Sequence, residues 1–164
     1  MTQTLRRMQK KRAAGDGGFT LVELLVVVVI IGVLVAIAVP MYLNYRKGAA
    51  NKSAESDVRA AVSAVEQFYT ENNNTYPFDG SSTADKLIFG TTGSGATATG
   101  GTQQTATLSP GNSMQYKNNG ASYRICGMNS DGKTIYVYDS SVGGSVKKAT
   151  AQADLGACIA SATP

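Results

Sequence analysis

An uncharged apolar run with a single acid at its entrance constrains this chain more than any other feature. Leu24 to Tyr45 contains no charged residue, and Glu23 stands immediately before it. A helix needs about 20 apolar residues to cross a hydrocarbon core of about 30 Å, so the run is long enough to span a membrane. Lipid offers the backbone no hydrogen-bond partners, and a single span must therefore be helical.

The acid at the entrance of this run is unusual. A carboxylate at mid-membrane depth costs roughly 2.5–3.5 kcal/mol, and less near the interface. We therefore expect Glu23 to have a function and a partner that the uncut chain does not supply.

The basic charge of the chain is concentrated before the apolar run. The first 18 residues have a net charge of +4, whereas the rest of the chain holds ten basic and ten acidic side chains. A lysine- and arginine-rich flank on one side of an apolar span faces the cytoplasm. The pattern predicts a leader at residues 1–18, an N-terminus inside the cell and everything after the span outside. It does not indicate nucleic-acid binding.

The residue types of catalytic and metal sites are scarce. The chain has no histidine, which removes the commonest general acid or base and the commonest metal ligand. Asp131 and Asp139 are too sparse to argue for calcium. We expect no enzymatic activity, no catalytic residue, no cofactor and no metal.

The two cysteines, Cys126 and Cys158, both lie in the part that should be exported. An even pair in an exported domain predicts a disulfide, which by loop-closure entropy would contribute about 3.7 kcal/mol. Two separate buried thiols are the alternative.

A second helical pattern follows the apolar run directly. Apolar residues recur at spacings of three and four from Ala54 to Tyr69, with polar residues between them. The two patterns predict one helix from about Phe19 to Glu71, roughly 80 Å long at 1.5 Å per residue. Gly32 and Pro40 are expected to loosen or kink it, although a tolerated kink without a role in assembly remains the alternative.

The remaining sequence predicts a small antiparallel sheet. Residues 122–126 and 134–138 have the composition of a hairpin, with a turn at 129–132 and a third strand near 114–117. Residues 75–113, with their Gly- and Thr-rich stretch, are expected to be loop. The sheet should pack on the apolar stripe of the helix, which gives an α+β fold.

The N-terminal motif resembles that of type IV pilins and type II secretion pseudopilins. The resemblance rests on residues 17–23, which read GGFTLVE, on the apolar run, on Pro40 and on the following Tyr42-Leu43, and it covers roughly residues 10–76. It implies a leader at 1–18, a transmembrane and assembly helix at 19–45, and a globular domain at 46–164. In that domain the helix ends near 71, a loop follows at 75–113, and the sheet and tail occupy 114–164, giving the ladle shape of a pilin.

The resemblance also implies a life cycle. A prepilin peptidase would cut between Gly18 and Phe19 and methylate the new amine of Phe19. The subunit would wait in the cytoplasmic membrane and then enter a helical homopolymer, driven by an assembly ATPase and a membrane platform protein. Glu23 of one subunit would pair with the Phe19 amine of its neighbour. The filament would be an extracellular pilus (fimbrium) for adhesion, twitching motility or DNA uptake; direct DNA binding is not indicated.

Several other interpretations remain open. The chain could be the main pseudopilin of a type II secretion or competence pseudopilus, although those of secretion systems usually lack the disulfide and carry a calcium loop. It could be a membrane-anchored binding protein that never polymerises. An ordinary signal peptide would be cut after Ala36-Ile37-Ala38, before Val39. The eight tyrosines are expected to pack as core residues, and Lys147-Lys148 to be solvated.

Overall fold

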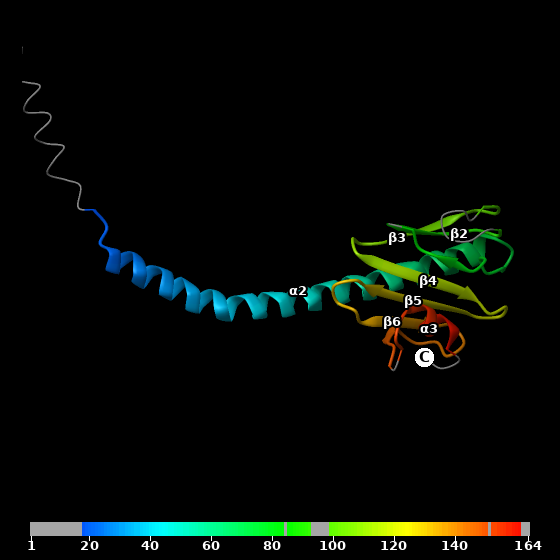
Figure 1. The fold of residues 1–164 in the computed structure, drawn as a ribbon. Helices are drawn as coiled ribbons and strands as arrows, with labels where there is room; N and C mark the ends of the chain where they lie inside the picture. Colours follow the sequence, from blue (N-terminus) through cyan, green and yellow to red (C-terminus); the bar gives the residue numbers. More distant parts are fainter. Residues whose placement is uncertain (1–17, 84, 93–98, 151, 162–164) are drawn as a thin grey trace, which may run out of the picture. The chain divides into compact units, whose positions relative to one another are not determined.

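A computed structural model describes residues 18–161, apart from 84, 93–98 and 151. The chain divides into two compact units, Met1–Leu43 and Asn44–Pro164, and each is described by itself. The predicted leader lies outside the described residues except for Gly18. One long helix, α2 (Leu21–Glu71), contributes its first part to the first unit and its second part to the second unit (Figure 1).

In the first unit, α2 is helical throughout and exposed. It is the one described helix long and apolar enough to cross a membrane, and none of its most apolar window is buried. The helix continues without a break through Gly32 and Pro40. The kink at these two residues stays a prediction.

In the second unit, five antiparallel strands form the main sheet. They are β1 (Gly80–Ser81), β4 (Asn112–Asn118), β5 (Tyr123–Asn129), β6 (Ile135–Asp139) and β7 (Lys147–Lys148). Their order is β1-β4-β5-β6-β7, so both outer strands are only two residues long. The predicted hairpin is β5–β6, and the predicted third strand is β4.

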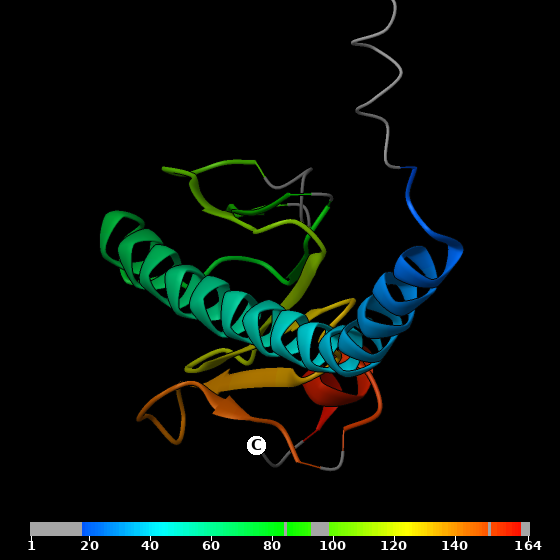
Figure 2. The same cartoon turned by 90° about the vertical axis from the view of Figure 1, so that its left-hand side faces the viewer.

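The second part of α2 covers one face of this sheet, as the green segment crossing the strands in Figure 2 shows. Val58, Val65 and Phe68 are fully buried there, because the spacings of three and four place them on one side of the helix. The approach is close: a Cβ on Gly127 of β5 would lie 2.5 Å from the Val58 side chain. The expected α+β fold, with a long N-terminal helix packed on a small antiparallel sheet, is confirmed.

The prediction of a loop over residues 75–113 was wrong in part. β2 (Lys86–Phe89) pairs with β3 (Gln104–Thr107) in a separate two-stranded sheet. Leu87, Phe89 and Ala106 of this hairpin are buried in the main core. The Gly- and Thr-rich composition hid β3, although threonine is β-branched and fits a strand well.

A short helix, α3 (Leu155–Ala160), was also missed. Asp154 caps it by accepting a hydrogen bond from the backbone N–H of Ala157 at 2.7 Å. Leu155 and Cys158 of α3 form a second small core with Cys126, Ile135 and Val137 of the sheet. Lys147 and Lys148 are exposed, as expected for solvated side chains, but their backbone forms the edge strand β7.

Candidate processing and assembly site

The peptide bond between Gly18 and Phe19 lies just before α2 begins. Gly18, Phe19 and Thr20 are exposed and outside the helix, and the Phe19 side chain is 82% exposed. A Cβ on Gly18 would meet nothing within 4 Å. The fold of this chain therefore places no demand for glycine at position 18, and a requirement for it would have to come from an enzyme that binds there.

Glu23 has a partner within its own chain. The backbone N–H and the hydroxyl of Thr20 each donate a hydrogen bond of 2.8 Å to the Glu23 carboxylate. In return the Glu23 N–H donates to the Thr20 hydroxyl at 3.3 Å. These reciprocal contacts form a capping box, in which two orphan donors at the helix start are satisfied.

This contact corrects the expectation that Glu23 has no partner before the leader is removed. Thr20 already supplies two donors in the uncut chain, and a carboxylate in the first helical turn also interacts favourably with the helix dipole. The pattern T-x-x-E at Thr20–Glu23 is a readable signal for a capping box. The carboxylate is therefore held in place before any neighbour arrives.

After Glu23 the helix presents apolar side chains in every direction. From Leu24 to Leu43 each large apolar side chain is exposed; Leu34, for example, is 61% exposed. A contiguous apolar surface of this extent marks a membrane or protein contact. The first unit thus offers a surface that lipid or other helices can cover.

The buried titratable groups of the second unit have structural roles. Burial raises the pKa of Tyr116, and burial together with a hydrogen bond to Glu66 raises the pKa of Tyr123. The Tyr123 hydroxyl donates to Glu66 at 2.6 Å and is thereby held protonated. The rings of five tyrosines pack against one another at centroid distances of 4.4 to 5.8 Å; they are Tyr69, Tyr76, Tyr116, Tyr123 and Tyr138. The prediction of ordinary core packing holds for these five.

Among the residues that the structure describes, no group of three or more His, Cys, Asp or Glu could hold a metal ion. The site is therefore one of processing and contact, built from a scissile bond, a capped carboxylate and an apolar surface.

The C-terminal tail is fixed to the sheet at two points. The predicted disulfide between Cys126 and Cys158 is present, so neither cysteine is a free thiol. Beside it, the buried Arg124 donates to Asp139 and to the carbonyls of Cys158 and Ser161. The sequence carried no local signal for this ion pair, because the two residues are brought together only by the β5–β6 register.

Comparison with known proteins identifies the N-terminal segment. Residues 14–39 match the model of the prokaryotic N-terminal methylation motif. The chain is 40% identical over 70 residues to type II secretion system core protein G of Aeromonas hydrophila, covering 43% of this chain and 46% of that protein. It is 42% identical over 84 residues to the type IV major fimbrial protein FimA of Dichelobacter nodosus, covering 51% and 49%.

The chain belongs to the type IV pilin and pseudopilin family. Another relative is the type IV major pilin protein PilA of Myxococcus xanthus, 36% identical over 61 residues, with 37% of this chain and 28% of PilA covered. The matches span less than half the length of these relatives, and no solved structure matches the chain. The pilin relatives and the secretion relatives are similar to this chain to a comparable degree.

Proposed function

We propose that this chain is the precursor of a structural pilus subunit that polymerises through α2 after its leader is removed. The observation that carries the proposal is the exposed apolar half of α2, with a capped Glu23 at its start and an accessible Gly18–Phe19 bond in front. Residues 1–18 would be the leader, residues 19–45 the assembly helix and residues 46–164 the globular domain. The role is structural, without catalysis.

Processing creates the group that assembly needs. Hydrolysis of the Gly18–Phe19 bond by a prepilin peptidase releases a new amine at Phe19, which the same enzyme methylates. This cationic amine of one subunit then pairs with Glu23 of its neighbour, and the carboxylate exchanges its Thr20 contacts for the ion pair. Buried ion pairs are better attested as devices that fix register than as net stabilisers, and this pair would set the axial register of the filament.

The apolar surface supplies the driving contacts. Side chains from Leu24 to Val39 replace lipid contacts with contacts to other subunits. Gly32 and Pro40 would let the helix stretch or locally unwind as it packs, because each weakens the helical hydrogen-bond ladder or its propensity.

The proposal also fixes location and partners. The precursor would span the cytoplasmic membrane once with its N-terminus inside, and the mature subunit would leave the membrane for an extracellular pilus. An assembly ATPase and a membrane platform protein would drive this step, and the filament would serve adhesion, motility or DNA uptake.

A pseudopilus subunit is the second candidate, supported by the similarity to the type II secretion core protein G. The Cys126–Cys158 disulfide favours the pilus, since main secretion pseudopilins are expected to lack it and to carry a calcium loop. Among the described residues no acidic cluster suits such a loop.

The test combines the mature N-terminus with assembly. Mass and N-terminal sequencing should find methylated Phe19, and Gly18→Leu should leave the chain uncut. Glu23→Ala should be processed normally but yield at least about tenfold fewer filaments, because the ion pair is lost. Glu71→Ala, which removes an exposed carboxylate from the other end of α2, is the matched control. A mature chain that begins at Val39, or normal filaments from Glu23→Ala, would contradict the proposal.

A further inference from the structure

A helical filament needs contacts that differ on the two sides of each subunit. When one surface of a chain fits a different surface of the same chain and the rotation does not close, the copies form an open helical filament. The apolar half of α2 supplies one such surface. The second unit carries an exposed aromatic side chain and a separate hollow that could supply another.

The exposed aromatic side chain is Phe78, which is 60% exposed. Its backbone is fixed, because its N–H donates to the carbonyl of Gly90 at 3.0 Å. Packing within the chain therefore does not account for the outward side chain. It lies two residues before β1, at one edge of the main sheet.

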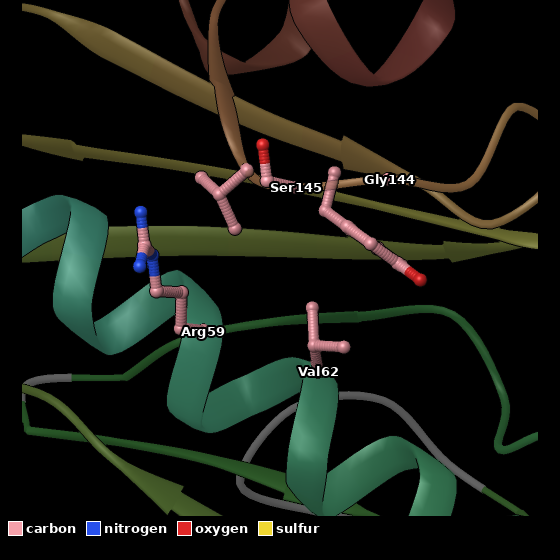
Figure 3. A pocket seen from close by; sticks show the side chains of 6 residues that line it. Arg59, Val62, Gly144 and Ser145 are labelled. Atoms are coloured by element: carbon pink, nitrogen blue, oxygen red, sulfur yellow. The ribbon is translucent and has the colours of Figure 1, made fainter.

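The hollow lies toward the opposite edge of the same sheet, between α2 and the segment that leads into β7. It has a volume of about 160 Å³, and its lining residues are Arg59, Val62, Tyr138, Gly144, Ser145 and Val146. Figure 3 shows Arg59 and Val62 projecting from α2 toward the segment that carries Gly144 and Ser145. An apolar cavity of about 150 Å³ holds a benzene molecule, so the hollow is large enough for one phenyl ring.

The charges beside the two features are complementary. Asp79 follows Phe78 directly, with its side chain 55% exposed and its contact to Lys117 loose at 3.6 Å. At the hollow, the Arg59 side chain is 60% exposed and makes a surface ion pair with Glu55, a type of contact worth little in water. A guanidinium can stack on an aromatic face as well as pair with a carboxylate.

We propose that Phe78 of one subunit inserts into this hollow of the next subunit, with Asp79 facing Arg59. The placement of the two features at opposite edges of the sheet makes the contact head-to-tail, so it continues from copy to copy. The inference rests on the proposed filament function and names a second interface for it, outside the apolar half of α2.

The test uses the full-length chain assembled into filaments. The photo-crosslinking residue p-benzoylphenylalanine replaces Phe78 and, in a control, the exposed Ala121 of the β4–β5 turn. Illumination should link position 78 to a second copy, and peptide mass spectrometry should place the link within residues 59–62 or 138–146. Position 121 should give no link to those residues.

A substitution provides a second measurement. Phe78→Ala should speed filament dissociation about tenfold, as expected for loss of an aromatic anchor. The melting temperature of the monomer and leader removal should not change. Val142→Ala removes an equally exposed apolar side chain that does not line the hollow, and it should leave dissociation unaltered.

The outcomes separate this inference from the proposed function. Filaments in which position 78 links to other residues, to another protein or to nothing would overturn the Phe78 contact and leave the filament function standing. Equal dissociation of Phe78→Ala and wild-type filaments would do the same. A wild-type chain that is processed but never forms filaments would overturn both.

Discussion

The two halves of α2 have the same backbone and opposite surroundings. In the first half Leu34 is 61% exposed, whereas in the second half Val58 and Phe68 are completely buried against the sheet. The first half is apolar on all sides, and the second half is apolar on one side only. The more apolar half is thus the exposed one, so its surface is made for contacts outside its own chain.

The largest effect that separates the two halves is expected from truncating a large side chain in each. Phe68→Ala should lower the free energy of unfolding of the second unit by about 3–5 kcal/mol, since it leaves a cavity in the core. Leu34→Ala should leave that free energy unchanged. Denaturant unfolding of the full-length chain in detergent, followed by tyrosine near-ultraviolet circular dichroism, measures both. Similar losses in the two variants would show that the first half contributes to the core.

A smaller effect concerns pH and belongs to the second unit alone. Burial by itself would raise the pKa of Asp139, but hydrogen bonds from Ser141 and Arg124 outweigh it, so the pKa lies below its ordinary value. A lowered folded pKa gives stabilisation that is fully present above the unfolded pKa of about 3.9 and is lost as the pH falls through the folded value. The second unit should therefore lose stability in acid below about pH 4, by roughly 1.4 kcal/mol for each unit of the shift.

The contribution of Asp139 can be isolated by substitution. Asp139→Asn should lower stability at neutral pH and flatten the acid-dependent part of a stability–pH curve measured by denaturant unfolding. Asp85→Asn, at an exposed position of the same unit, should keep the wild-type slope. An unchanged slope in Asp139→Asn would assign the acid sensitivity to other carboxylates.

The smallest effect is expected at the start of the first half. Thr20→Val removes the hydroxyl of the capping box and should destabilise the first turn of α2 by about 1 kcal/mol. Amide hydrogen exchange in detergent should become several times faster at Glu23 and Leu24. The melting temperature of the second unit should stay the same. Unchanged exchange at these amides would mean that Thr20 does not hold the helix start.

Much of this fold follows from local sequence patterns. The helix, its two halves and the β5–β6 hairpin follow from spacing and turn residues, and the disulfide follows from an even cysteine count in an exported part. The β2–β3 hairpin was missed because Gln104–Thr107 has no large apolar residue, and only pairing with β2 identifies it as a strand.

The polar contacts were harder to predict than the elements. Thr20–Glu23 is a local motif and was readable. Arg124 and Asp139 are 15 residues apart, and their pairing depends on strand register, which the sequence sets only through the packing of the whole sheet. The same holds for Phe78 and the hollow near Val62, since a surface hollow requires the folded positions of three separate segments.

The two edges of the main sheet have a consequence for subunits held at high density. An exposed strand edge is a template for pairing with another chain, and long pairings of this kind lead to irreversible cross-β aggregation. Here β1 and β7 are each two residues long, and the residues of β7 are both lysines. Neighbouring sheets therefore offer each other almost no backbone to zip together, which leaves side-chain contacts to hold subunits side by side and allows them to separate again without unfolding.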